Sequence, residues 1–166
     1  MSVVAADERL SLRRLHWQRM AARDGVAGEL FDVLFEDQSW WVRYLVIDTI
    51  GAMPRRDLLV RPAQVESVTP LRLALTREEL KRCPELGEER PVYLQQETGR
   101  APRTADPRLR SAEIILGFAV REGGRAAGRV IDVELDAGRW LPGRRRTLEA
   151  RTVRAIDWIA RTIDLG

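Results

Sequence analysis

One segment of the chain occurs twice, and this internal similarity restricts the folds that the sequence can adopt. Four aligned pairs lie 100 residues apart (132 − 32): Ala27, Gly28, Asp32 and Val33 with Ala127, Gly128, Asp132 and Val133. Four later pairs lie 88 residues apart (136 − 48): Asp48, Pro54, Arg56 and Val65 with Asp136, Pro142, Arg144 and Val153. The change in spacing predicts two small units, the second shortened by 12 residues (100 − 88).

The alignment also predicts where the second copy is shortened. In the first copy the intervening residues 34–47 read LFEDQSWWVRYLVI, the pattern of a hairpin tip and its returning strand. Only Glu134 and Leu135 remain between the aligned blocks of the second copy. A barrel without one strand leaves unpaired backbone groups at an edge. The first unit, residues 91–98 or another chain could cover that edge, and the last alternative makes a homodimer one hypothesis.

Turn residues and apolar patterns predict a mainly β chain. Asp24 and Gly25 favour a tight hairpin turn between strands over residues 15–22 and 26–35. Residues 40–48 are rich in aromatic and β-branched side chains, so they should form the strongest strand, with two apolar faces.

A short helix is expected after the strands of the first unit. Further strands are predicted over residues 57–61 and 65–75. Thr76 and Glu79 then have the spacing of a capping box, in which each side chain bonds a backbone N–H of the other residue. Pro84 should end this helix after about two turns.

The composition of residues 98–110 predicts a linker, because they combine two prolines, a glycine and several charges without apolar periodicity. The expected domains are therefore residues 12–97 and a shortened second unit, 111–166. Within the second unit, strands are expected over residues 113–121, 128–136 and parts of 146–163, with a turn over 140–143.

Composition limits the classes of function that the chain can serve. Apolar residues make up 45% and charged residues 32%, as in a folded globular protein. No apolar run reaches the roughly 18 residues that cross a bilayer, and the N-terminus lacks a signal-peptide pattern. We expect a cytoplasmic protein without membrane insertion. Cys83 and His16 are the only residues of their types, so we expect no disulfide within the chain, no metal and no cofactor.

Carboxylates suggest a catalytic site only weakly. Asp32 and Glu36 share a face of one predicted strand, with Asp37 nearby, so paired carboxylates are conceivable there. The recurrence of Asp32 as Asp132 favours a structural role instead, because two unequal units rarely hold the same catalytic group. We therefore predict no catalytic residue and no enzymatic activity.

Two groups of residues are candidates for binding a partner. Trp40, Trp41 and Trp140 are candidate interface residues, since tryptophan and arginine dominate interface energetics. A second group, Arg144, Arg145 and Arg146, could contact an anion. From Arg100 onward the net charge is +5 (14 − 9), which would direct an acidic partner to this half, although solvated arginines are the commoner explanation.

Several of these segments resemble the PRC-barrel family. This small β-barrel occurs in the cytoplasmic domain of the photosynthetic reaction-centre H subunit and in the C-terminal domain of a ribosome maturation factor. In the first copy the similar segments are residues 24–40, 41–65 and 73–85. In the second copy they are residues 109–136 and 139–145.

The resemblance implies a fold and a kind of function. It implies two small β-barrels in tandem, the second shortened. Family members are scaffolds that dock onto a membrane protein complex or a ribosomal protein and carry no catalytic residues of their own. The chain is therefore expected to be a non-enzymatic adaptor that binds another protein or itself. The alternative is a factor that associates with RNA or the ribosome through its arginine-rich second half.

Overall fold

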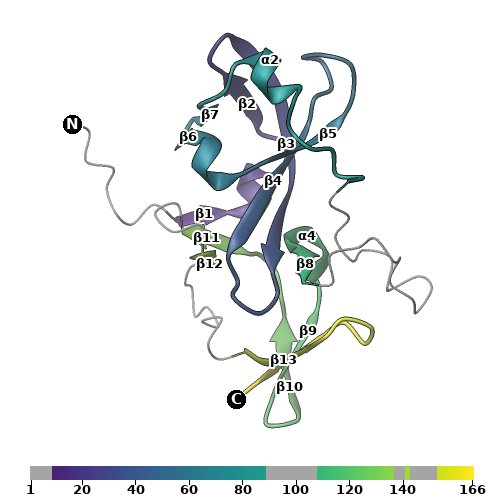
Figure 1. Ribbon diagram of the computed structural model, residues 1–166. Coiled ribbons are helices and arrows are strands. Elements are labelled where there is room, and N and C mark those ends of the chain that lie inside the picture. Colours follow the sequence, from purple (N-terminus) through teal and green to yellow (C-terminus); the bar gives the residue numbers. More distant parts are fainter. Residues whose placement is uncertain (1–8, 89–107, 137–140, 143–152) are drawn as a thin grey trace.

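The computed structural model describes residues 9–88, 108–136, 141–142 and 153–166 (Figure 1). We refer to its described parts before and after residue 100 as the N-terminal and C-terminal halves. Both halves are mainly β, as the sequence predicted. None of the helices in the described residues has the length and apolar character to span a bilayer.

The largest sheet belongs mostly to the N-terminal half. Its strands follow the order β5-β4-β3-β2-β7-β6, and β8 of the C-terminal half also pairs with β3. Figure 1 shows the long β3–β4 hairpin running through the middle of the molecule. The strand bounds are β2 (Arg19–Ala22), β3 (Gly25–Glu36), β4 (Val42–Asp48), β5 (Asp57–Val60), β6 (Val65–Val68), β7 (Leu71–Leu73) and β8 (Leu109–Ser111).

Two smaller sheets and a few short helices complete the fold. One sheet has the order β1-β11-β12 and the other β10-β9-β14-β13. Their bounds are β1 (Arg9–Ser11), β9 (Ala119–Glu122), β10 (Arg125–Arg129), β11 (Glu134–Asp136), β12 (Leu141–Pro142), β13 (Val153–Asp157) and β14 (Thr162–Leu165). The helices are α1 (Leu12–Leu15), η1 (Pro62–Gln64), α2 (Arg77–Leu80) and α4 (Ala112–Ile115). No pairing between described residues closes any of these sheets into a barrel.

Two local predictions are confirmed. The strand expected over residues 40–48 is β4, whose residues are buried except for half-buried Arg43. The capping box is also present, because the backbone N–H of Thr76 donates to Glu79 Oε2 at 2.7 Å. In return, the backbone N–H of Glu79 donates to Thr76 Oγ1 at 3.2 Å. The helix α2 has four residues, so it is shorter than the predicted two turns.

The strands predicted over residues 15–22 and 113–121 are wrong in their first halves. In both places a one-turn helix comes first and the strand begins only at Arg19 or Ala119. Serine hydroxyls cap these helices: Ser11 Oγ accepts from the N–H of Arg14, and Ser111 Oγ accepts from that of Ile114, both at 3.3 Å. A helix of one turn is too short to show a helical period in the sequence.

The same order of elements occurs in both halves at a spacing of 100 residues. The series β1-α1-β2-β3 of the N-terminal half corresponds to β8-α4-β9-β10. The sheet order β3-β2-β7-β6 likewise corresponds to β10-β9-β14-β13, with a parallel pair, β2–β7 or β9–β14, inside each. One hydrophobic core nevertheless contains residues from both halves, among them Leu45, Phe118 and Ile163.

The strand register corrects the predicted position of the shortening. Leu135 pairs with Pro142 as Phe35 pairs with Val42, so Pro142 corresponds to Val42 and not to Pro54. The base of the hairpin that the alignment removed is therefore present, and Leu141 and Pro142 lie in β12. The shortening falls after Pro142, because Val153 follows it by 11 residues (153 − 142), whereas 23 residues (65 − 42) separate Val42 from β6. The alignment matched residue types in a short motif, whereas backbone pairing sets the register.

Each half contributes a strand to a sheet of the other. The strand β8 pairs with β3, and β1 pairs with β11. Residues 109–110 of the predicted linker thus lie in a strand, and residues 98–107 fall outside the described part. Of the three sources that could cover the second unit, the first unit contributes β1, and residues 91–98 lie outside the described part.

Two serine–aspartate hydrogen bonds join the halves where these strands meet, and we call them the Ser–Asp clasp. Ser111 Oγ donates to Asp32, and Ser11 Oγ donates to Asp132. The backbone contacts match as well. The N–H of Glu113 donates to Asp32 Oδ1, and that of Arg13 to Asp132 Oδ1, both at 3.2 Å.

The two sides of the clasp differ in burial. Asp32 is 1% exposed, whereas Asp132 is only half-buried. Burial raises the pKa of Asp32 to about 6, against the opposing effect of hydrogen bonds from Ser111 and from the N–H groups of Val33 and Glu113. The folded protein therefore binds a proton at Asp32 more tightly than the unfolded chain does.

Protonation of Asp32 should make stability fall as the pH rises. Its stabilising contribution is fully present below the unfolded pKa of 3.8 and is lost as the pH rises through about 6. From about pH 4 to about pH 7, wild type should lose on the order of 3 kcal/mol of unfolding free energy that Asp32→Asn retains. Urea denaturation of both proteins across this range measures the difference. Parallel pH profiles would contradict the prediction.

The two serines should contribute unequally to stability. Ser111→Ala removes a hydrogen bond from a buried carboxylate and should cost about 2 kcal/mol at pH 7. Ser11→Ala should cost less than about 1 kcal/mol, because water can reach its half-buried partner Asp132. Urea denaturation of each variant gives the comparison, and equal losses would show that burial does not distinguish the two bonds.

Candidate protein-binding groove

The tip of the β3–β4 hairpin presents two tryptophans. The N–H of Trp40 donates to the carbonyl of Glu36 at 2.8 Å, and the N–H of Glu36 donates to that of Trp41 at 3.0 Å. Trp40 has a φ of 62°, which is uncommon for a residue with a side chain. Its indole stacks on Phe35 with 5.2 Å between ring centroids. Backbone bonds and stacking together fix the direction of the Trp40 side chain.

Trp40 forms one wall of a groove between the hairpin tip and the C-terminal half. The groove has a volume of about 620 Å³. Its other lining residues come from the tip and from β13 with the turn after it: Asp37, Gln38, Ser39, Val153, Arg154, Ala155, Ile156 and Trp158. Trp40 itself is half-buried, whereas Trp41 beside it is 55% exposed. The exposed indole of Trp41 is at the same hairpin tip but is not among the residues that line the groove.

Trp158 forms the opposite wall, and its ring contacts Arg110 and Phe118. The guanidinium carbon of Arg110 lies 4.5 Å from the centroid of the Trp158 ring, within the range of a cation–π contact. The rings of Phe118 and Trp158 also pack in a T-shaped arrangement, with 5.8 Å between centroids. Arg110 Nε in turn donates to Asp37 Oδ2 at 2.9 Å. The chain Asp37–Arg110–Trp158 thus connects the two walls.

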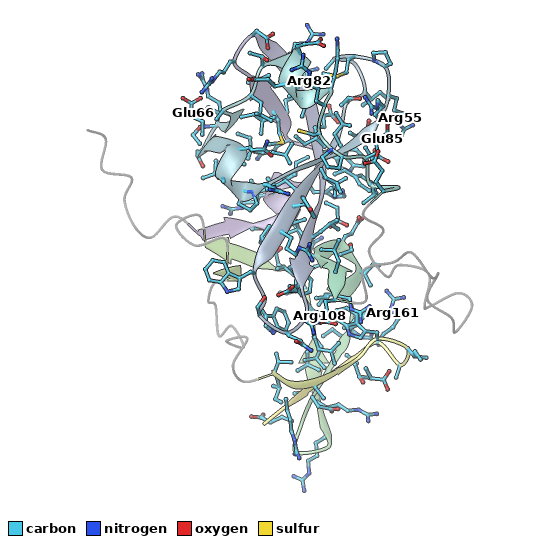
Figure 2. All side chains as sticks on the ribbon, in the orientation of Figure 1. Arg55, Glu66, Arg82, Glu85, Arg108 and Arg161 are labelled. Carbon is cyan, nitrogen blue, oxygen red and sulfur yellow. The ribbon has the colours of Figure 1, made fainter. Side chains whose placement is uncertain are left out.

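A backbone bond strengthens the same junction. The N–H of Asp37 donates to the carbonyl of Arg108 at 3.0 Å, and within the C-terminal half the N–H of Ala119 donates to the carbonyl of Arg161 at 3.0 Å. In Figure 2, Arg108 and Arg161 lie at the level where the hairpin tip meets the C-terminal sheet. The groove is consequently built on elements of both halves, and it depends on their relative position.

The groove has the composition of a protein-binding site. Two indoles supply a large apolar surface, and Gln38, Ser39 and Arg154 supply hydrogen-bonding groups at its border. Aromatic residues and arginine are enriched in interface cores, where they fill pockets of the partner. The arrangement can hold an apolar side chain between the indoles while the polar groups bond the backbone of a partner.

The predicted site residues are only partly located. Trp40 lines the groove, and Trp41 follows it at the hairpin tip without being one of the lining residues. Trp140 and the three arginines of the predicted anion contact lie outside the described residues: Arg144, Arg145 and Arg146. Sequence reasoning did not identify Trp158, Arg110 or Asp37 as parts of one site. No local pattern could have done so, because strand pairing across the two halves brings them together.

The three carboxylates considered for catalysis point to different partners. Asp32 lies in the Ser–Asp clasp, and Asp37 pairs with Arg110. Glu36 accepts a hydrogen bond from Ser39 Oγ at 2.7 Å. No group of three or more histidine, cysteine or acidic residues in the described part of the chain is arranged to hold a metal ion. Cys83 is half-buried, and burial raises the pKa of its thiol.

Comparison with known proteins gives no relative from which to transfer a function. No protein-family model and no curated protein sequence matches this chain. A function for this chain therefore has to be inferred from the residues and geometry of the groove and from the resemblance of its sequence segments to the PRC-barrel family.

The ion pair beneath the groove should stabilise the junction of the halves. Its side chains are only 18% and 10% exposed for Asp37 and Arg110, so Asp37→Ala leaves a guanidinium in a poorly hydrated place. We expect a loss of about 2 kcal/mol in unfolding free energy. Glu78→Ala, which removes an exposed partner of Lys81, should cause no measurable change. Equal effects in urea denaturation would argue against a structural role for Asp37.

Proposed function

We propose that this chain is a non-enzymatic adaptor that binds a protein partner in the groove between Trp40 and Trp158. The observation that carries the proposal is the indole of Trp40, which is stacked on Phe35 and lies across the groove from Trp158. Trp41, the next residue of the hairpin tip, is 55% exposed. Its framework is two PRC-barrel-like units, of which the second is shorter. The similar segments of the sequence and the recurrence of the element order support this framework.

The exposure of Trp41 is the first argument for binding. A large exposed aromatic side chain leaves apolar surface in water, and a contact with a partner would remove it. Trp17 is exposed to a similar extent, 48%, but its ring packs against Phe31 with 5.4 Å between centroids. It also stacks on His16 at 4.8 Å. The ring faces of Trp17 are thus partly used within the protein.

The fixed orientation of Trp40 is the second argument. Stacking on Phe35 holds its indole before any partner arrives. A side chain that is already ordered loses less conformational entropy on binding, so more of the contact energy appears as affinity. The Asp37–Arg110 ion pair and the contact of Arg110 with Trp158 hold the opposite wall in the same way.

Association with RNA or the ribosome is the alternative. Exposed arginines of the C-terminal half favour it, among them Arg121, Arg125, Arg129 and Arg154. Phosphate contacts would make such binding strongly dependent on salt and on intact RNA. Binding through the two indoles should depend little on either, since it relies on apolar burial. The two alternatives therefore differ in a property that is simple to measure.

Replacement of Trp41 should abolish capture of the partner. We expect Trp41→Ala to recover any protein bound at the hairpin tip from cell extract at a level at least roughly tenfold below wild type, as for a hot-spot residue. Trp17→Ala is the matched control, because it removes an indole of similar exposure from another surface. Quantitative mass spectrometry of captured proteins, with and without ribonuclease, gives the comparison.

Two outcomes would contradict this function. Identical sets of captured proteins from Trp41→Ala and Trp17→Ala would show that the hairpin tip beside the groove does not select a partner. Loss of all captured material after ribonuclease treatment, with no effect of Trp41→Ala, would favour the RNA alternative. The solution mass of the wild type, measured in parallel, tests self-association independently of the groove.

A further inference from the structure

A second hollow lies beside α2, apart from the groove at the hairpin tip, and we call it the α2 recess. Its volume is about 340 Å³, within the range of small-molecule sites. Its lining comes from β4, from β5 and the residue after it, from η1, and from residues 75–84 around α2. In Figure 2, Arg82 of this lining lies at the α2 end of the molecule, whereas Arg108 and Arg161 lie at the level of the groove. The α2 recess is thus a separate site on the N-terminal half.

Backbone hydrogen bonds fix the walls of the α2 recess. The N–H of Leu59 donates to the carbonyl of Pro84 at 2.8 Å, which holds the segment after α2 against β5. The N–H of Ala74 donates to the carbonyl of Gln64 at 2.8 Å, which holds η1 against the end of β7. The walls are therefore in place before a ligand arrives, so binding would cost little ordering of the protein.

The inner lining of the α2 recess is apolar. Leu59 is 1% exposed and Tyr44 is 5% exposed, and both belong to one buried cluster. Leu75 and Cys83 beside them are half-buried. Close packing holds these side chains in position. A lining of this kind removes the apolar part of a ligand from water, and that removal is the main favourable term in binding.

The charges of the outer lining favour an anion. Arg61 and Arg82 are exposed and bring two guanidinium groups to the α2 recess. The one acidic residue of the lining is Glu79, whose Oε2 already accepts from the N–H and the Oγ1 of Thr76, at 2.7 and 3.0 Å. The lining has a net charge of +1 (2 − 1). Guanidinium groups bond the paired oxygens of carboxylates and phosphates in a matching planar geometry.

We propose that the α2 recess binds a small amphipathic anion, a carboxylic acid or a phosphate monoester with an apolar body. The body would lie against Tyr44 and Leu59, and the head would face Arg61 and Arg82. Gln64 Oε1 accepts from the N–H of Arg61 at 2.9 Å, which leaves the amide N–H groups of Gln64 to donate to the same head. At about 30 Å³ for each water molecule, the volume equals roughly eleven waters, enough for a short hydrocarbon chain. This site is additional to the adaptor function of the groove.

The chain contains a single reporter for this site. Cys83 is its only cysteine and lines the α2 recess, so a bound ligand should shield the thiol. The full-length protein is treated with N-ethylmaleimide, a neutral reagent, and mass spectrometry follows the modification. Octanoate or octyl phosphate at about ten times its dissociation constant should slow the reaction roughly tenfold, because only unliganded protein reacts. The two dissociation constants show which head the site prefers.

Neutral and cationic analogues test the role of charge. Octanamide has the same hydrocarbon chain as octanoate without a charge, and octylammonium carries a positive charge. We expect both to bind at least about tenfold more weakly than the better anion, because neither forms a charge-assisted bond with a guanidinium group. Their effect on the rate of Cys83 modification gives the comparison.

Three arginine variants locate the head of the ligand. Arg61→Gln and Arg82→Gln should each raise the dissociation constant of the better anion about tenfold, since each removes one charge-assisted contact. Arg125→Gln is the matched control and should leave it unchanged, because this exposed arginine lies on β10 of the C-terminal half. All three side chains are on the surface, so the variants should fold as wild type does. Trp41→Ala should also bind the anion normally, which separates this site from the groove.

Several results would overturn the proposal. Equal protection of Cys83 by octanamide and octanoate would show that charge does not select the ligand. Protection by octylammonium alone would assign the α2 recess to a cation held by Glu79. Unchanged dissociation constants in both Arg61→Gln and Arg82→Gln would place the anion elsewhere. An unchanged rate with either anion, at every concentration below micelle formation, would show that the α2 recess does not bind such a ligand.

Discussion

The hydrogen bond from Ser111 to the buried carboxylate of Asp32 fixes the C-terminal half on the N-terminal half. It occurs where β8 pairs with β3, and it also starts α4, because the same hydroxyl caps that helix. A buried carboxylate is costly unless it is hydrogen-bonded or protonated. The raised pKa of Asp32 shows that burial outweighs the bonds it accepts. The junction is therefore held in place by a group that either half alone would leave incompletely bonded.

The groove follows from this junction. Arg110 precedes Ser111 in β8, so the pairing that positions the serine also places the guanidinium beside Asp37 at the hairpin tip. The same guanidinium lies over the ring of Trp158. A strand added from a distant part of the chain thus connects both walls of the groove. The geometry of a binding site at such a junction therefore depends on the main contact between the halves, the pairing of β8 with β3.

Local patterns in the sequence predicted the elements with strong signals. The run of aromatic and β-branched residues predicted β4, and the spacing of Thr76 and Glu79 predicted the cap of α2. The one-turn helices α1 and α4 were missed because four residues do not establish a period. Pro142 was aligned with Pro54 because residue types agree there, whereas the pairing with Leu135 fixes the register. The wall formed by Trp158 depends on long-range pairing, which no single segment encodes.

The two halves share several local features of structure but place them in different surroundings. The Ser–Asp hydrogen bond, the capped turn and the left-handed glycine of the hairpin occur in both halves at the same spacing. What differs is the surroundings: a Cβ at Gly28 would overlap the carbonyl oxygen of Asp48, whereas no heavy atom of the described residues lies within 4 Å of the corresponding position at Gly128. The aspartate of the clasp and the glycine with positive φ are thus common to both halves. Some corresponding positions carry different residue types, such as Glu29 and Arg129 or Phe31 and Ile131. The fold does not require one residue type at these positions. Specificity for a partner should therefore be sought among the positions where the two copies disagree.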